Sequence, residues 1–480
     1  MNPTLTQRSS RSRWAGRVAV LAAAGMLGAC ASFAPDTGFD NVHQTARDKL
    51  GKDLVLARSD EDQATIDGRV AALLAQPLSA DDAVQLALLN NRGLQATFQD
   101  LGISGADVVQ AGRLPNPGFS FGRTTRGDEI EIERGLHFNL ARLLAMPLIR
   151  QVEQRRFEQT RSAVAMRVLA LAADTRKAWI QAVAADETVS YTRQVMQAAE
   201  AGAELARRMA AVGNFNKLQH AREQGFYADA ALQLAQAQQA QRASRERLTR
   251  LLGLWGAQAR FTLPERLPDL PAAPLDAPDI ERVALAQRLD VQGARAAAEQ
   301  TAKNLGLTRT TRFVNVLELG LVRNSSNEAP TQRGWEIGIE LPLFDWGGAR
   351  VAKAEAVYVQ ALHQAADTAI NARSEVREAY GNYRSAWDVA RHYRDEIVPL
   401  RKLIAEENLL RYNGMLIGVF ELLANARVQI ASVNGAIGAL RDFWIAKADL
   451  DMALVGKPGL GAPAAGTGTA MPADTGGAGH

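Results

Sequence analysis

The sequence predicts a mostly α-helical protein with a β-barrel part, built from two copies of a helix–strand–strand–helix–helix unit. Three observations predict this fold class. A short alternating strand leads directly into a very long helical segment, a similar arrangement occurs about 200 residues earlier, and the N-terminus looks like a membrane-targeting segment.

The strand and the long helix meet between Trp335 and Arg350. Apolar residues from Trp335 to Leu343 alternate with Glu336, Gly338 and Glu340, which predicts a strand with one apolar and one polar face. The junction that ends the strand contains Pro342, Phe344, Asp345, Gly347 and Gly348. We expect Asp345 to cap the following helix and the glycines to permit a sharp turn. The helical pattern then continues for roughly sixty residues, far beyond the usual globular length.

Residues 1–29 are expected to be a signal peptide, because four arginines precede an apolar run from Val18 to about Gly28. The run ends in Leu27-Gly28-Ala29-Cys30, which resembles a bacterial lipobox, so we predict that Cys30 is lipidated. The alternative is an ordinary signal peptide with an incidental buried cysteine. In lipoproteins an Asp after the cysteine favours the inner membrane, so Ala31 implies the outer membrane.

Composition excludes several classes of function. Removal of the four signal-peptide arginines changes the formal net charge from +3 to −1, so charge gives no reason to expect a nucleic-acid partner. Cys30 is the only cysteine, and the histidines show no metal-ligand spacing. No catalytic or nucleotide-binding motif is present either. We therefore expect no enzyme activity, cofactor or metal site.

The first half follows a clear order. Residues 30–76 lack strong periodicity and are predicted to be an extended, lipidated leader. The first repeat covers residues 77–263, with a helix capped by Ser79 that runs to about Gly112. Strands follow at about 117–141, turning at Arg126-Gly127-Asp128. Two helices of roughly 65 and 40 residues come next, separated by Gly213-Asn214.

A proline-rich linker at 264–279 leads to the second repeat, residues 280–455. Its helix at 280–304 precedes strands at about 313–344, with a loop at 324–327. Pro399 is expected to kink the long helix that follows. A turn at Arg411-Tyr412-Asn413-Gly414 leads to a last helix ending near Val455, and residues 456–480 are expected to be disordered.

The two halves align at similar offsets. The aligned positions are Arg113 and Asn116 with Arg312 and Asn315, residues 92–95 with 289–292, Ala178-Trp179 with Ala379-Tyr380, and Gly213 with Gly414. Trp179, Tyr380, Tyr383 and Trp387 are expected to pack along helix seams rather than stack on ligands.

Four amphipathic strands cannot close a barrel, and an open sheet in lipid leaves unpaired backbone groups that cost several kcal/mol each. Three chains would supply twelve strands, which is within the range of outer-membrane barrels. The long helices are too polar for lipid, so they would project from the membrane as a bundle or tube. The alternative is a non-conducting periplasmic coiled-coil lipoprotein scaffold.

Residues 77–455 resemble the TolC-like outer-membrane factor family, which includes outer-membrane efflux lipoproteins. The resemblance rests on the lipobox, the duplicated layout, the LPLFDWGG junction, Pro399 and the turns at Gly213 and Gly414. The resemblance implies a homotrimer with a twelve-stranded transmembrane β-barrel over a periplasmic α-helical barrel. It also implies an exit duct for efflux or type I secretion that docks on a periplasmic adaptor protein and an inner-membrane pump.

The resemblance also implies roles for residues at the periplasmic tip. Gly213, Asn214, Asn413 and Gly414 would form the adaptor-facing turns, and Arg411 and Tyr412 would hold the tip closed. The family carries two acids three residues apart at its entrance, matched here by Glu421 and Ala424, so one carboxylate ring is retained. Three Glu421 carboxylates near a three-fold axis could bind a cation. The alternative is a solvated acid on the helix surface. Drugs, metal ions and polypeptides all remain possible cargoes.

Overall fold

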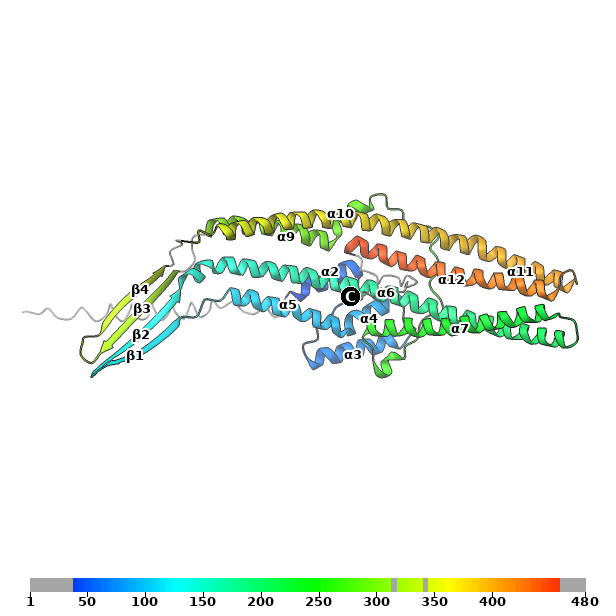
Figure 1. The fold of residues 1–480 in the computed structure, drawn as a ribbon, viewed down its shortest axis with the longest axis horizontal. Helices are drawn as coiled ribbons and strands as arrows, with labels where there is room; N and C mark the ends of the chain where they lie inside the picture. Colours follow the sequence, from blue (N-terminus) through cyan, green and yellow to red (C-terminus); the bar gives the residue numbers. More distant parts are fainter. Residues whose placement is uncertain (1–37, 312–316, 340–343, 458–480) are drawn as a thin grey trace, which may run out of the picture. The chain divides into compact units, whose positions relative to one another are not determined.

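The computed structural model describes residues 38–311, 317–339 and 344–457 (Figure 1). The predicted signal peptide, the lipidation site Cys30, Pro342 and residues 458–480 lie outside the described residues.

The chain is mostly helical and contains one four-stranded sheet, as the sequence predicted. In the first half the elements are α2 (Phe39–Leu50), α3 (Asp60–Leu74), α4 (Ala80–Asn90), α5 (Arg92–Ala111), β1 (Gly118–Arg126), β2 (Glu129–Asn139), α6 (Leu140–Ala211), α7 (Lys217–Leu252) and the 3₁₀ turn η1 (Gly256–Ala259). In the second half they are α8 (Ile280–Gln287), α9 (Leu289–Thr311), β3 (Leu317–Ser326), β4 (Gln332–Ile339), α10 (Gly348–His392), the π-helical segment η2 (Tyr393–Ile397), α11 (Val398–Asn413) and α12 (Val419–Val455).

The chain divides into two compact units. Among the described residues, the sheet unit contains 38–42 and the ranges 96–164 and 295–364, and the helical unit contains 43–95, 165–294 and 365–457. Long helices such as α6 contribute residues to both units.

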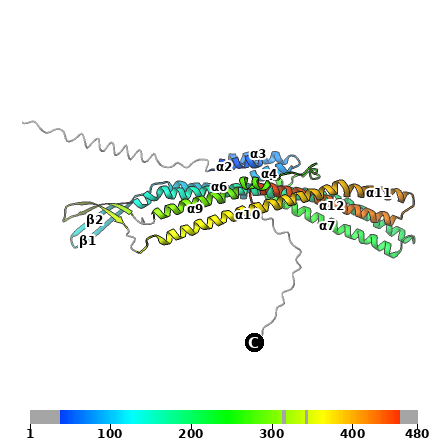
Figure 2. The ribbon, with the colours of Figure 1, turned by 90° about the horizontal axis from the view of Figure 1, so that it is seen from above.

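In the sheet unit the strands are antiparallel in the order β1-β2-β3-β4. Each repeat contributes one hairpin, and the β2–β3 pairing joins them, with Leu136 opposite Leu321. Helix α9 lies beside the first part of α10 (Figures 1 and 2), where Arg309 and Glu355 form an ion pair at 2.5 Å. Asn139 at the end of β2 accepts a hydrogen bond from the Arg142 N–H at 2.7 Å, so a strand residue stabilises the start of α6.

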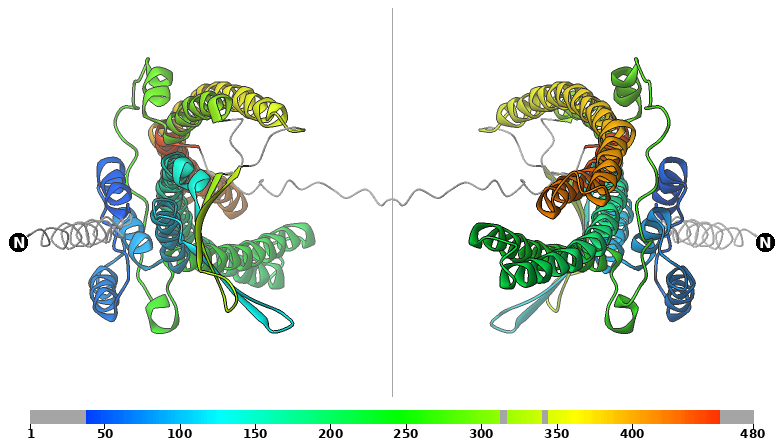
Figure 3. Two further views of the ribbon diagram at one scale, coloured as in Figure 1. Left: turned by 90° about the vertical axis from the view of Figure 1, so that its left-hand side faces the viewer. Right: turned by 90° about the vertical axis from the view of Figure 1, so that its right-hand side faces the viewer.

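In the helical unit two long hairpins, α6–α7 and α11–α12, lie in one curved layer in the end-on views of Figure 3. Lys177 on α6 pairs with Asp449 on α12 at 3.0 Å. Tyr383 and Trp387 on α10 pack against Phe443 on α12 in a buried cluster. The predicted seam role of these aromatic residues is thus confirmed.

The two repeats attach their first helices in the same way. Trp179 Nε1 donates a 2.7 Å hydrogen bond to the carbonyl of Leu78, just before α4. Its aligned residue Tyr380 donates from its hydroxyl to the carbonyl of Leu275, before α8, at 3.4 Å. The proline-rich linker is also hydrogen-bonded to the long helices. The indole N–H groups of Trp387 on α10 and Trp444 on α12 donate to the carbonyls of Pro271 and Pro268, respectively.

The prediction of an extended leader between residues 31 and 76 was wrong for its described part, because α2 and α3 form there. Each buries a narrow stripe of apolar residues four apart, Val42 with Ala46 and Ile66 with Val70. Ser59 and Asp62 form a capping box at the start of α3. A stripe of only two residues is too weak a periodic signal to stand out in sequence.

The first helix of each repeat is broken where the sequence predicted one continuous helix. Asn91 and Arg288 both have extended backbone, with ψ of 111° and 126°, and these two positions are equivalent in the repeat alignment. The Arg288 side chain is buried and pairs with Asp290 at 2.7 Å and Glu375 at 2.6 Å. Burial opposes the charged form, but these two hydrogen-bonded carboxylates hold the pKa of Arg288 above its ordinary value.

Several boundaries differ from expectation. Helix α6 begins at Leu140 and includes Pro147, which lies beyond the first turn and removes one i→i−4 backbone hydrogen bond from the helix. Residues 324–326, predicted as loop, continue β3, and β4 begins at Gln332. The segment just before Pro399, residues 393–397, is π-helical, and Pro399 itself removes a donor from the α-helical ladder.

Candidate functional site

The sheet has one apolar and one polar face. Because paired residues in adjacent strands share a face, the register gathers large apolar side chains from all four strands on one side. These residues are Phe119, Phe121, Ile130, Ile132, Leu136, Phe138, Leu317, Leu319, Leu321, Trp335, Ile337 and Ile339. Trp335 is 70% exposed and Phe119 is 68% exposed, so the described residues leave this face largely uncovered.

The opposite face is polar and acidic. It carries Glu129, Glu131, Glu133, Glu318 and Glu336, together with Arg126 and His137. His137 Nε2 lies 2.9 Å from the Ser120 hydroxyl, and its Nδ1 lies 3.3 Å from Glu336 Oε1. Glu336 on β4 reaches β2 by crossing Gly320 on β3, where a Cβ atom would collide with its side chain. The glycine therefore permits a polar connection across three strands.

Strands β1 and β4 each pair on one side only in the described sheet. The outer edges therefore present backbone N–H and C=O groups that pair with no strand among the described residues. A sheet with an uncovered apolar face and two open edges is suited to join further strands in an apolar solvent.

At the junction between β4 and α10, the Asp345 Oδ1 atom accepts a hydrogen bond from the Gly347 N–H at 2.8 Å. Asp345 is therefore not the helix N-cap that the sequence predicted, since α10 begins at Gly348. Gly347 has a φ of +73°, which accounts for a glycine at this position. Phe344 is 99% exposed.

The first helical tip has the predicted turn. Gly213 follows α6 with a φ of +82°, and the Asn214 N–H donates to the Met209 carbonyl at 2.8 Å. Asn216 then caps α7 by accepting from the Gln219 N–H at 2.8 Å. Asn214 thus lies within the turn between the two helices.

The second tip differs from the predicted turn. Arg411, Tyr412 and Asn413 belong to the last turn of α11. Gly414 has a φ of −81°, whereas Met415 takes the left-handed conformation with a φ of 58°. The Leu416 N–H donates to the Arg411 carbonyl at 2.8 Å, the same bond that Asn214 makes at the first tip. The structural equivalent of Gly213 is therefore Met415, one residue after Gly414.

The predicted gate residues lie together around this second tip but do not bond to one another. Glu421 occupies the third position of α12 and is exposed. Within the part of the chain that the structure describes, the side chains of Arg411, Tyr412 and Glu421 form no ion pair with one another. Ala424 lies one turn further along α12.

Sequence reasoning missed an ion pair between the hairpins. Arg427 on α12 places Nη2 at 2.8 Å from Oε1 of Glu223 on α7, and its guanidinium lies 4.2 Å from the Phe226 ring centroid. Glu223 is 1% exposed. One acid among the many polar residues of α7 gives no sequence signal for burial, so only the helix packing identifies this pair.

The tips also expose apolar side chains. Val212 and Leu218 flank the first turn, and Met415 and Leu416 form the second. All four are strongly exposed, although residues at a hairpin turn are usually polar. The tips therefore offer an apolar contact surface to a partner.

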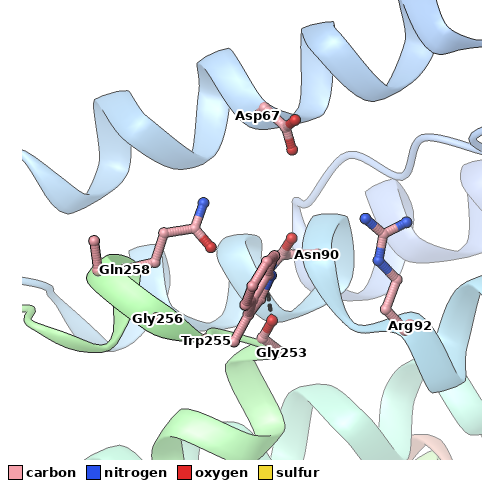
Figure 4. A pocket seen from close by; sticks show the side chains of 8 residues that line it. Asp67, Asn90, Arg92, Gly253, Trp255, Gly256 and Gln258 are labelled. Carbon is pink, nitrogen blue, oxygen red and sulfur yellow. Dashed lines mark hydrogen bonds between the residues drawn. The ribbon is translucent and has the colours of Figure 1, made fainter.

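A separate hollow of about 350 Å³ lies beside Trp255 in the helical unit (Figure 4). The side chains of Asp67, Asn90 and Arg92 are already engaged. Gln63 bonds both Asp67 and Arg92, and Asn90 donates to the Gly253 carbonyl at 2.9 Å. We assign this hollow no function.

None of the described helices has the length and apolar character that a membrane-spanning helix needs. The described residues also contain no cluster of three potential metal ligands.

No protein-family model matches the chain. The cobalt-zinc-cadmium resistance protein CzcC of Cupriavidus metallidurans is 26% identical over 288 residues, which cover 56% of this chain. The match spans 64% of the length of CzcC.

Solved structures match over more of the chain. A crystal structure of CusC, described as forming a transmembrane channel, matches with a TM-score of 0.64 and 17% identity over 79% of this chain and 92% of CusC. The Campylobacter jejuni CmeC outer membrane channel matches with a TM-score of 0.63 and 16% identity over 86% of this chain and 91% of CmeC. The chain thus has the fold of these outer-membrane channels, and the resemblance predicted from sequence is confirmed at the level of the fold.

Proposed function

We propose that this chain, with its TolC-like outer-membrane factor fold, is the outer-membrane exit duct of a tripartite efflux or type I secretion system. One observation carries the proposal: an open sheet with an uncovered apolar face continues directly into helices that are too polar for lipid. This combination suits a chain that places its strands in a membrane and its helices in water.

Three copies would combine their sheets into a twelve-stranded barrel, pairing β1 of one chain with β4 of the next. Such closure would remove both open edges, and the acidic face would line the lumen. The long helices would then form a periplasmic tube. The predicted signal peptide and lipidated Cys30 belong to this proposal, since a lipid anchor would hold the assembly at the outer membrane.

The two helical tips would face a periplasmic adaptor fed by an inner-membrane pump. The exposed apolar residues Val212, Leu218, Met415 and Leu416 support this role, because an adaptor would cover them. In the trimer, Arg411 and Tyr412 would have partners on neighbouring chains, and three Glu421 side chains would surround the entrance.

Divalent metal ions are the first cargo to test, because the relative CzcC is named for cobalt, zinc and cadmium resistance. The proposed lumen face carries five glutamates against one arginine, which would favour cations over anions. Drugs and polypeptides stay open as cargoes, since pump and adaptor also select the substrate.

The test replaces Cys30 with Ser, fractionates the membranes, and examines the protein on an unheated detergent gel and in planar bilayers. The duct proposal expects a detergent-requiring trimer with small conductance that increases after Arg411→Ala or Tyr412→Ala. A monomer that is extracted without detergent and does not conduct would instead support the periplasmic scaffold.

A further inference from the structure

Three arginines lie in a row across the apolar face of the sheet. Arg134 on β2 is directly opposite Arg323 on β3, and Arg323 is directly opposite Arg333 on β4. Their Cβ atoms are therefore separated by only about 5 Å from strand to strand.

The row lacks compensating negative charge. Like charges directly opposite each other destabilise a sheet. The glutamates on β2 and β4 alternate with these arginines and so lie on the other face. Within the described residues none of the three arginines has an ion-pair partner, and Arg134 Nη1 bonds only the Ser325 hydroxyl, at 3.3 Å. An anion bound against the row would remove this repulsion.

The same face is hollowed beside the arginines. A depression of about 350 Å³ is lined by the three arginines and by Phe119, Leu136 and Leu321. One side of the hollow is therefore cationic and the other is apolar. A free inorganic anion would use only the cationic side, whereas an anionic amphiphile would use both.

We propose that this hollow binds the phosphate groups of a phosphorylated glycolipid in the outer leaflet of the membrane. Planar guanidinium groups match phosphate oxygens with paired charge-assisted hydrogen bonds, and neighbouring acyl chains would cover Phe119, Leu136 and Leu321.

The choice of leaflet rests on the proposed function. Two further apolar rows, containing Leu136 and Phe138, lie between the arginine row and the strand ends that lead to the helices. Arg323 and Arg333 are thus nearer the hairpin turn at Asn327, and Arg134 lies midway along β2. If the helices are periplasmic, the turns face the exterior, where the phosphorylated glycolipid is found.

The test compares Arg323→Gln/Arg333→Gln with the control Arg123→Gln/Arg126→Gln, which removes the same amount of charge from β1, outside the row. The full chain is purified in mild detergent, and native mass spectrometry measures retention of bisphosphorylated lipid A. We expect the row variant to lose about tenfold or more in apparent affinity and the control to stay within about twofold. Dephosphorylated lipid A should bind weakly to all three proteins. Unheated gels check that each variant remains oligomeric.

Equal retention of lipid A by the wild type and the row variant would overturn this inference. Equal binding of phosphatidylglycerol and lipid A would overturn the assignment to a glycolipid. Both results can occur in a trimeric, conducting protein, so they leave the proposed duct intact. A wild type that needs no detergent would refute the duct itself.

Discussion

Arg427 on α12 and Glu223 on α7 form an ion pair at 2.8 Å that joins the two helical hairpins. Glu223 is buried, and Leu423 approaches the position where a Cβ atom on Gly202 of α6 would lie. The hairpins are therefore linked through side chains close to the tips, where an entrance would have to widen.

Removal of the carboxylate charge should loosen this link. We expect Glu223→Gln to destabilise the helical unit by about 3 kcal/mol, because Arg427 keeps its charge and loses its buried partner. Thermal unfolding followed by circular dichroism measures the change. Glu204→Gln is the matched control, since Glu204 pairs with Arg207 and Arg208 on an exposed surface and should have little effect. Equal effects of the two substitutions would contradict a special role for the buried pair.

The two tips should respond oppositely to glycine. Gly213→Ala is expected to cost about 1 kcal/mol, because a left-handed backbone disfavours a side chain. Met415→Gly is expected to stabilise the second tip by less than about 1 kcal/mol, since the gain is offset by the greater freedom of glycine in the unfolded chain. Thermal melts of both variants check the signs. Gly414→Ala is the control, and a loss there as large as at Gly213 would restore Gly414 as the strained position.

The buried Arg288 should behave as part of a network. Arg288→Met is expected to destabilise the protein by about 3–5 kcal/mol, because Asp290 and Glu375 lose their shared cation. Adding Glu375→Leu should recover part of the loss by removing one of the unpaired charges. A double-mutant cycle in denaturant measures this coupling. Strictly additive losses would show that Arg288 and Glu375 act independently.

Glu187 should make stability depend on pH. Burial raises the pKa of Glu187 above its ordinary value, although the Leu267 N–H and Arg266 partly oppose the shift, and Oε2 has no hydrogen-bond partner. The folded state therefore holds the proton more tightly, so this residue's contribution to stability falls as the pH rises from 4.5 through the raised pKa. Glu187→Gln should have a higher Tm than the wild type at pH 7, with the difference vanishing near pH 4.

Glu204 is the control for the pH-dependent melts of Glu187→Gln, because its pKa is shifted in the opposite direction. Hydrogen bonds from Arg207 and Arg208 lower its pKa to about 2. Its contribution is present above its ordinary pKa of 4.5 and is lost as the pH falls toward 2. Glu204→Gln should therefore not raise the Tm at pH 7. A rise of the same size in both variants would mean that charge reduction alone explains the effect at Glu187.

The sequence correctly predicted the structural elements that depend on residues close together in the chain. The hairpin turn at Gly127, the Ser79 cap and the alternation from Trp335 to Ile339 depend on residues within a few positions of one another, and each is present. The apolar face of the sheet followed directly from period-two alternation.

The features that sequence missed depend on distant partners. The break after Asn90 is held by its side-chain bond to the Leu252 carbonyl, 162 residues away. The break at Arg288 likewise involves the Ala453 carbonyl. The Glu223–Arg427 pair joins residues 204 positions apart. No short-range pattern contains these partners, so the arginine and glutamate residues resembled ordinary surface charges.

The second tip was misplaced for a different reason, which the π-helical segment explains. Trp179 and Tyr380 are 201 residues apart, but Gly213 and Met415, which share the left-handed conformation, are 202 apart. A π-helical turn accommodates one extra residue within a helix. Such a turn occurs between Tyr380 and Met415, at Tyr393–Ile397, whereas α6 is α-helical throughout. The helix thus accommodates the extra residue of the second repeat at this segment, and Met415 has the same left-handed backbone conformation as Gly213.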